Sequence, residues 1–156
     1  MNVEIGQDIM KLKEDIPEKS TIKEEIINTW QLEIGSIGLK AEISEGTTQE
    51  VLNKYIGHFE NTSKETGNIG LAAHNRGYEV NYFERLKELK QGDEIKYQYN
   101  QYQNVYEVYK NIIIKDDDWE KLEQTEENML TLITCVENQP EYRRCVQARE
   151  KEPQEG

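Results

Sequence analysis

A cysteine at the end of an apolar run is the first candidate for chemistry in this chain. Cys135 closes the string TLITC, His74 closes a second apolar string, NIGLAAH, and an arginine pair, Arg143 and Arg144, follows in PEYRRCVQA. A nucleophilic thiol needs a partner that exchanges protons, a group that stabilises an oxyanion, and access to solvent. Imidazole and guanidinium meet the first two needs. These residue types are therefore typical of cysteine-dependent acyl transfer, provided that the fold brings them together.

The same residues also have plain structural interpretations. A single cysteine on an apolar strand commonly packs in a core, and a buried histidine is commonly a hydrogen-bonded structural residue. Successive strand residues point to opposite faces, so only one of Arg143 and Arg144 can face Cys135. Cys145 shares the face of Arg143, and we expect it to pack rather than to react. Residue types alone leave both interpretations open.

Short strands must position these side chains. Most of the apolar residues fall between Trp30 and Val146. Alternating, β-branched or aromatic patterns predict strands in WQLEIGSIGLKAEI, NIGLAAH, DEIKYQYN, NVYEVYKNIIIK, NMLTLITCVE and YRRCVQAR. Seven or eight short strands with two or three small helices predict a mainly β fold. We expect the sheet to close into a barrel, because closure removes exposed strand edges.

Three short segments predict helices. TQEVLNKYIGHF predicts a helix that ends in a turn at Gly57. NYFERLKELK places Phe83, Leu86 and Leu89 on one helical face, and DDDWEKLEQ begins with aspartates suited to a helix N-cap.

Both ends of the chain differ from its middle. Residues 1–29 predict a helical, partly disordered extension, in which Ile5 and Ile9 begin an apolar face and Pro17 ends the first helix. Residues 30–149 hold the β-barrel. Residues 150–156 are charged and predict a disordered tail. The chain therefore divides into an extension, one domain and a tail.

The composition excludes several classes of protein. The 156 residues carry a net charge of −12, whereas a nucleic-acid binder needs clustered lysines and arginines. The sequence contains no run of 18 apolar residues, so it predicts no membrane-spanning helix. Two cysteines give no disulfide framework, and two histidines without a CxxC motif give little support for a zinc site.

Several strings together resemble the sortases, the cysteine transpeptidases of Gram-positive cell surfaces. TLITC is similar to their TLxTC strand, and RRCVQA is similar to the strand that follows, where counting back from Ala148 selects Arg143. LAAHNRG is similar to the small-small-His pattern of the family and selects His74. LEIGSIGLKAEISEGT and GHFENTS resemble its first strands and loops. The resemblance runs from Trp30 to Arg149.

The resemblance implies a closed eight-stranded sortase-type barrel and a defined reaction. It implies that Cys135 is the nucleophile, His74 the acid/base partner, and Arg143 the group that holds the substrate or the oxyanion. It also implies that Thr134 lines the site beside the nucleophile and that Ala72 lines the substrate groove. The thiolate would attack the Thr carbonyl of an LPxTG-like sorting motif and release glycine. An amine of a cell-wall precursor or of a pilin would then take the acyl group.

Two other functions remain open at this point. One is a catalytically silent β-barrel that binds a peptide or a wall component, and the other is a cysteine peptidase that only hydrolyses. Within the sortases, class A-like, class D-like and class E-like members remain possible, and we favour a class D-like one. The stretch from His74 to Cys135 is short for the helical insertion of class B, and no Asp-Pro-aromatic lid precedes the barrel.

The resemblance also bears on cofactors and location. We expect no cofactor, although some sortases bind calcium, for which acidic residues lie in suitable loops: Glu60, Glu65, Glu120 and Glu123. With 31 acidic residues in the chain, a solvated acidic surface is the plain alternative. The resemblance implies a position on the extracellular face of the cell membrane, held by an anchoring segment outside the given sequence.

Overall fold

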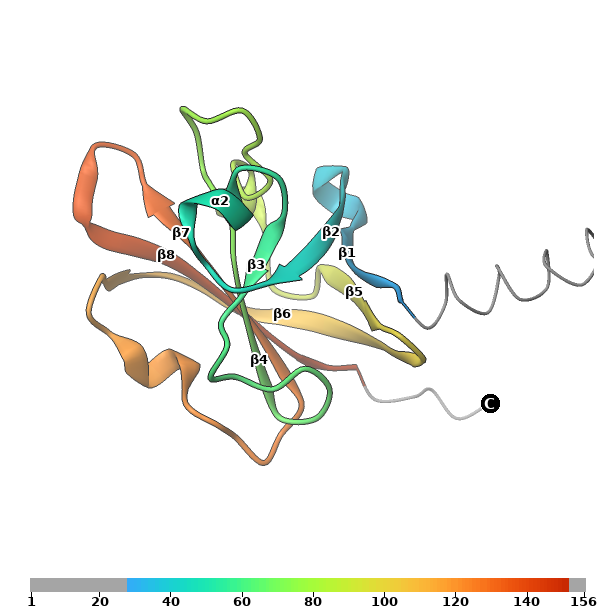
Figure 1. Cartoon of the computed structure of the whole chain (residues 1–156). Coiled ribbons are helices and arrows are strands. Elements are labelled where there is room, and N and C mark those ends of the chain that lie inside the picture. Colours follow the sequence, from blue (N-terminus) through green and yellow to red (C-terminus); the bar gives the residue numbers. More distant parts are fainter. Residues whose placement is uncertain (1–27, 152–156) are drawn as a thin grey trace, which may run out of the picture.

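Eight strands close into a barrel in the computed structural model, which describes residues 28–151 (Figure 1). The strands are β1 (Trp30–Ile34), β2 (Leu39–Glu45), β3 (Ile56–His58), β4 (Asn68–Ala72), β5 (Glu94–Tyr99), β6 (Tyr102–Lys115), β7 (Met129–Val136) and β8 (Gln139–Glu150). The mainly β barrel that the sequence predicts is confirmed. The predicted helical extension falls on residues 1–27 and lies outside the described residues.

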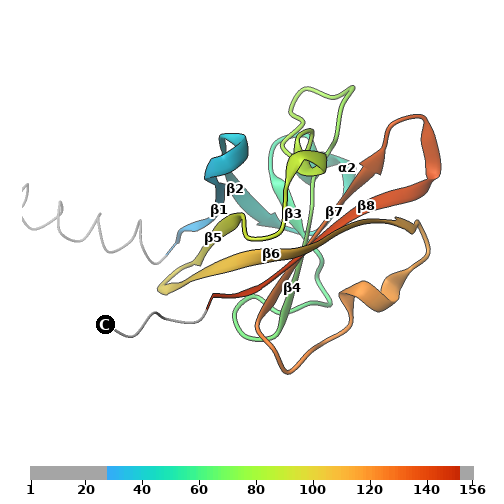
Figure 2. The same ribbon diagram turned by 180° about the vertical axis from the view of Figure 1, so that it is seen from behind.

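The order of neighbouring strands decides which strand ends meet. Around the barrel the order is β1-β2-β3-β4-β7-β8-β6-β5, and β5 pairs back with β1. The β2–β3 and β4–β7 pairs are parallel, whereas the other pairs are antiparallel. Figure 2 shows the barrel from the opposite side, where β5 and β6 can be followed as neighbouring strands. Because β4 and β7 run in parallel, their carboxyl ends lie at the same end of the barrel.

Alternation along each strand separates an inner face from an outer face. On β7, Leu130 and Leu132 are fully buried in the main core, and on β8 Val146 and Ala148 join them. The residues between them point outward. Four further hydrophobic residues are buried but lie outside the main core cluster: Ile114, Leu122, Met129 and Cys145.

The helical segments are shorter than the sequence predicts. The predicted helix in TQEVLNKYIGHF is confirmed as α2 (Gln49–Leu52), and η1 (Gly35–Ile37) connects β1 to β2. The other two predicted helices are wrong, because each is a single 3₁₀ turn, η2 (Leu86–Glu88) or η3 (Trp119–Leu122). None of the helices in residues 28–151 is long and apolar enough to cross a membrane.

A threefold spacing explains the first of these differences. Phe83, Leu86 and Leu89 are all buried, and their spacing of three residues fits the three residues per turn of a 3₁₀ helix. At η3, the side chain of Asp118 makes no capping hydrogen bond, so the expected N-cap is missing.

Two boundaries also differ from the expectation. Gly57 lies within β3 rather than in a turn, and a Cβ at this position would lie 2.4 Å from the carbonyl oxygen of Gly46. The predicted tail begins at residue 150, but β8 continues to Glu150. The backbone N–H of Lys151 donates to the carbonyl of Val105 at 2.8 Å.

Candidate active site

The parallel ladder between β4 and β7 aligns the histidine segment with the cysteine strand. Its last pair joins Ala72 to Ile133. Two residues further along the chain are His74 on one side and Cys135 on the other. Ala73 and Thr134, which lie between, are buried on the inner side. Ala72 and Ile133 lie on the outer face, and His74 and Cys135 each lie two residues beyond them. By alternation, His74 and Cys135 therefore lie on the outer face at the same level of the barrel.

Two hydrogen bonds fix this alignment. The hydroxyl of Thr134 donates to the carbonyl of Ala73 at 2.7 Å, in a buried setting, and the side-chain amide of Asn75 donates to the carbonyl of Cys135 at 3.1 Å. The residues on either side of His74 are thus bonded to the cysteine strand. The register between the imidazole and the thiol depends on both bonds.

Thr134 lies on the inner side of the barrel. It is 4% exposed and its hydroxyl is engaged with Ala73. Consecutive strand residues point to opposite faces, so the side chain of Thr134 lies on the face opposite to that of Cys135. Thr134 supports the site from the inner side, and a substrate contact of this residue stays a prediction. Ala72, by contrast, is half-buried at an outer-face position of β4.

The antiparallel ladder between β7 and β8 distinguishes the two arginines. Cys135 pairs with Arg143, and Thr134 pairs with Arg144. Directly opposed residues of an antiparallel pair share a face, so Arg143 and Cys135 lie on the same side of the sheet. Nη1 of Arg143 donates to the carbonyls of Pro140 and Tyr142, at 2.7 and 2.8 Å. These bonds hold the guanidinium against the β7–β8 hairpin.

Arg144 has a structural environment instead. Its Nη1 donates to the side-chain oxygen of Asn111 at 2.8 Å. The amide of Asn111 in turn donates to the carbonyls of Leu86 and Leu89, both at 3.0 Å. Arg144 therefore connects β8 to the segment that carries η2.

The two cysteines differ in access. Cys135 is exposed and Cys145 is fully buried. Burial raises the pKa of the Cys145 thiol to about 12, which leaves it protonated at neutral pH. Only Cys135 meets the requirement that a nucleophile be accessible, and the expectation that Cys145 packs in the protein agrees with its burial.

His74 is buried beneath an aromatic ring. It is 7% exposed, and its ring is stacked on that of Tyr78 with centroids 3.6 Å apart. Its Nε2 atom is buried and has no hydrogen-bond partner among the described residues. Burial lowers the pKa of His74 below its ordinary value of 6.5, because the imidazolium loses hydration. The neutral imidazole can therefore accept a proton at neutral pH.

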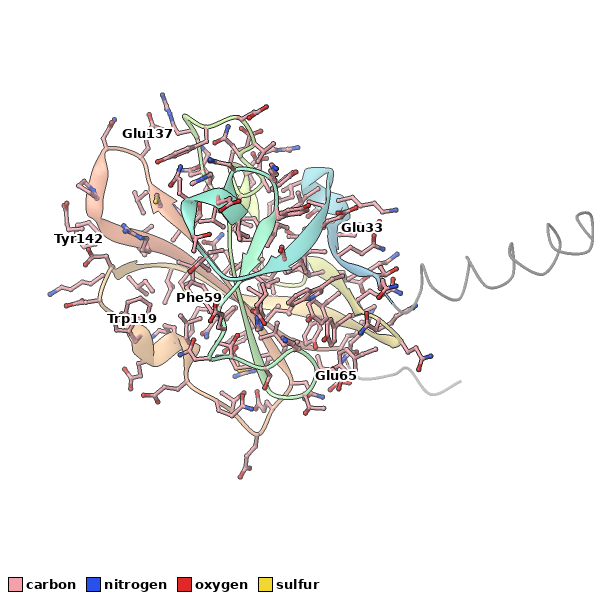
Figure 3. The ribbon with its side chains drawn as sticks, in the orientation of Figure 1. Glu33, Phe59, Glu65, Trp119, Glu137 and Tyr142 are labelled. Carbon is pink, nitrogen blue, oxygen red and sulfur yellow. The ribbon has the colours of Figure 1, made fainter. Side chains whose placement is uncertain are left out.

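Segments around the site are tied to one another. Arg76, two residues after His74, forms an ion pair with Glu137. Figure 3 shows Glu137 at the tip of the β7–β8 hairpin, Tyr142 on the β8 side of the same hairpin, and Trp119 in the segment between β6 and β7. Trp119 is 63% exposed, a larger fraction than for the other exposed large hydrophobic side chains of residues 28–151, Tyr78 and Ile113.

Sequence reasoning missed Asn75 and Tyr78. Asn75 directly follows His74, but no pattern in the sequence predicts that its amide reaches the carbonyl of Cys135. Tyr78 lies in an irregular loop, where no periodicity predicts which ring it contacts. Both interactions depend on how the loop returns over the barrel, so they became visible only in three dimensions.

The acidic loops show no metal centre. Within residues 28–151, no group of three or more His, Cys, Asp or Glu side chains is arranged to hold a metal ion. The segments that follow β3 and β6 are instead joined directly. The amide of Gln124 donates to the Ser63 hydroxyl at 2.8 Å, and the amide of Asn68 donates to the carbonyls of Lys121 and Glu123, both at 2.9 Å. The expectations about calcium and other cofactors stay predictions.

Two surface cavities lie on another part of the barrel. One, of about 620 Å³, is lined by residues of β1, β5, β6 and β8, including Gln31, Gln98 and Asn104. The other, of about 690 Å³, is lined by residues that include Gly92, Tyr109 and Arg149. Neither cavity is lined by His74, Cys135 or Arg143. The candidate site is therefore identified by the positions of these three side chains and not by a cavity.

Known proteins share this sequence and this architecture. A family model described as the sortase domain matches residues 32–151. Sortase D of Bacillus subtilis (strain 168) is 33% identical over 107 residues, which are 67% of this chain and 52% of that protein. Sortase A of Bacillus anthracis is 28% identical over 135 residues, which are 86% of this chain and 63% of that protein. The chain thus spans between half and two thirds of these relatives.

A solved structure gives a fuller match. It is that of a Clostridium perfringens sortase D5 transpeptidase, which is 34% identical in sequence and superposes with a TM-score of 0.71. The match covers 87% of this chain and 88% of the other. The family model matches residues 32–151, which include nearly the whole barrel. The chain belongs to the sortase family.

Proposed function

We propose that this protein is a cysteine transpeptidase that cuts an LPxTG-like sorting motif between Thr and Gly and transfers the acyl fragment to an amine. One observation carries the proposal. Ala72 pairs with Ile133 two residues before His74 and Cys135, Cys135 pairs with Arg143, and the thiol of Cys135 is exposed. This arrangement supports a thiol, an imidazole and a guanidinium that act together. A silent binding barrel has no need for this combination.

In the first half-reaction, the neutral imidazole of His74 takes the proton of the Cys135 thiol, and the sulfur attacks the Thr carbonyl carbon of the motif. A C–S bond forms, and the carbonyl oxygen becomes an oxyanion beside Arg143, whose positive charge stabilises it. Collapse of this intermediate breaks the C–N bond to glycine. His74 gives a proton to the departing amine, so that a neutral glycine amine and a thioester on Cys135 result.

In the second half-reaction, an amine attacks the thioester. His74 takes a proton from the attacking nitrogen, the C–S bond breaks, and His74 gives that proton to the leaving sulfur, so that Cys135 is again a thiol and His74 is again neutral. The products are a new amide and the free enzyme. Water in place of the amine would give hydrolysis, so the balance between transfer and hydrolysis depends on which nucleophile reaches the thioester first.

The other parts of the proposal follow from the same family membership. We place Ala72 at the substrate-facing side of β4. The partners are sorting-motif peptides of secreted surface proteins, together with an amine of a cell-wall precursor or a pilin. We place the protein at the extracellular face of the cell membrane, anchored by a segment outside the given sequence. Two of the matched proteins are named sortase D or D5, which supports a class D-like member.

A panel of peptides tests the proposal. The full chain is incubated with LPxTG-like peptides and a short amine acceptor, and the products are identified by mass spectrometry. We expect a product that joins the N-terminal fragment of the peptide to the acceptor. Release of the free acid alone would support a peptidase, and intact peptides throughout would contradict the proposal. Cys135→Ala is the negative control, and Cys145→Ala is the matched cysteine variant.

A further inference from the structure

The ring of Tyr78 covers the imidazole of His74. The ring centroids are 3.6 Å apart and the two planes differ by 7°, so the rings lie face to face. Tyr78 is 47% exposed whereas His74 is 7% exposed. The phenol ring therefore separates the imidazole from solvent on one side. An exposed aromatic side chain in this position contributes little to the core, since the main core cluster does not include it.

The loop that carries Tyr78 is held in place by its own hydrogen bonds. The backbone N–H of Tyr78 donates to the side-chain oxygen of Asn81 at 3.2 Å, and the amide of Asn81 donates back to the carbonyl of Tyr78 at 2.8 Å. Gly77 has a φ of 87°, a conformation that suits glycine. The N–H of Phe83, which is buried, donates to the carbonyl of His74 at 3.1 Å. The stacked pair thus belongs to an ordered turn.

The imidazole lacks the hydrogen-bonded support that usually orients a catalytic histidine. In nucleophile–base pairs, a third group commonly fixes the base. Here Nε2 is buried and has no partner in residues 28–151. Tyr78 is stacked on the face of this imidazole, and this contact restricts the plane of the ring.

We propose that Tyr78 is the positioning residue of His74: its ring fixes the plane of the imidazole by stacking and keeps water from it. The role of His74 in proton exchange belongs to the proposed function, on which this inference rests. Shielding favours the neutral ring, which can accept a proton. Stacking requires the ring but not the hydroxyl, so phenylalanine should replace tyrosine.

The first test measures the stack without turnover. Imidazole resonances of His74 are followed by NMR against pH in the Cys135→Ala background, with Tyr78 intact or changed to Phe or Ala. With Tyr or Phe, we expect ring-current-shifted His74 signals and a lowered pKa. With Tyr78→Ala, we expect the signals to lose that shift and the pKa to rise toward 6.5. Identical spectra and titrations in all three proteins would overturn the inference.

The second test measures the consequence for catalysis. We expect Tyr78→Ala to lower kcat about tenfold, with a smaller change in KM, and to move the acid limb of the pH profile. Tyr78→Phe should retain near wild-type kcat. Tyr109→Ala is the control for loss of a ring, because Tyr109 is half-buried and packs on Arg149 at 3.9 Å. A higher kcat in Tyr78→Ala would overturn the inference, because Tyr78 would then be an obstructing cover.

The two tests separate this inference from the proposed function. If the wild-type protein transfers no peptide but Tyr78→Ala changes the His74 titration as expected, the proposed function fails and the stacking inference stands. If transfer occurs and Tyr78→Ala changes neither the titration nor kcat, only the stacking inference fails. Thermal unfolding of each variant checks that the barrel is retained.

Discussion

The chain has two histidines and two cysteines. In each pair, one residue is fully buried and engaged in the fold, and the other has a group available for chemistry. His58 is fully buried, with Nδ1 2.5 Å from the carboxylate of Glu45 and Nε2 2.7 Å from the carbonyl of Ser63. His74 is also buried, but its Nε2 has no partner in the described part of the chain. Cys145 is enclosed, whereas Cys135 is exposed.

This comparison shows that burial alone does not identify a functional residue. His58 connects β3 to β2 and to the loop that follows β3, because its two nitrogens lie next to acceptors on Glu45 and Ser63. A histidine with both nitrogens satisfied has no free atom for proton exchange. His74 keeps one unsatisfied atom, which costs stability and is the kind of compromise that functional sites retain. Within each pair, a variant of one residue is the control for a variant of the other.

The two cysteines should differ most. We expect Cys135→Ala to lower kcat/KM for a sorting peptide by roughly 10³-fold or more, because no other accessible thiol can form the thioester. Cys145→Ala should keep turnover and lower the free energy of unfolding by about 1 kcal/mol, since it leaves a small cavity. Peptide-transfer kinetics and denaturant unfolding measure the two effects. Activity retained in Cys135→Ala would assign the nucleophile elsewhere.

The two histidines should separate activity from stability. We expect His74→Gln to lower kcat by about 10²- to 10⁴-fold through loss of proton exchange. His58→Gln should lower the free energy of unfolding by about 2 kcal/mol, because Glu45 and the Ser63 carbonyl lose their donors. Its kcat per folded molecule should stay near wild type. The opposite pattern would exchange the assignments of the two histidines.

The two arginines test the register of β8. We expect Arg143→Ala to lower kcat/KM by about 10²-fold, since it removes the charge beside the oxyanion. Arg144→Ala should change kcat/KM only severalfold and lower the free energy of unfolding by about 1 kcal/mol, because it loses its bond to Asn111. Steady-state kinetics of both variants decide this. A larger kinetic loss in Arg144→Ala would contradict the face assignment.

The smallest effect concerns the pH dependence of stability near His58. Burial alone would raise the pKa of Glu45, but hydrogen bonds from His58 and Lys64 outweigh it and lower the pKa below 4.5. A carboxyl with a lowered folded-state pKa stabilises the fold fully above its unfolded-state value and loses that contribution as the pH falls through the folded-state value. We therefore expect Glu45→Gln to reduce the loss of Tm between pH 7 and acidic pH.

The matched control for this measurement is Glu42→Gln, at an exposed position on the same strand. We expect this variant to keep the wild-type dependence of Tm on pH. Equal curves for wild type and Glu45→Gln would show that the ion pair with His58 contributes nothing measurable to stability.

The sequence predicted the barrel better than the segments that connect it. Alternating and β-branched runs depend on local rules, so strands such as β5 and β7 could be placed from the sequence. The helices at η2 and η3 were overextended, because a helix pattern does not distinguish several turns from one 3₁₀ turn in which Leu86 faces the core. The inner face of Thr134 follows from strand alternation, whereas its bond to Ala73 depends on the parallel neighbour strand and leaves no pattern in the sequence.

The candidate site was predictable in its parts but not in its connections. His74, Cys135 and Arg143 stand out by type and by their position in strings that resemble the sortases. The bonds of Asn75 and the stacking of Tyr78 depend on a loop that returns over the barrel, and such long-range contacts leave no periodic pattern in the sequence. The contacts of Asn75 with Cys135 and of Tyr78 with His74 are therefore known only from the structure, whereas the three motif residues are recognisable in the sequence.

The identity of the acylated atom tests the central claim most directly. The protein is mixed with a sorting peptide without an amine acceptor, quenched in acid, digested and analysed by mass spectrometry. We expect a thioester of the N-terminal peptide fragment on Cys135, which hydroxylamine releases and which does not form in Cys135→Ala. An acyl group on Cys145, or cleavage of the peptide by Cys135→Ala, would contradict the account.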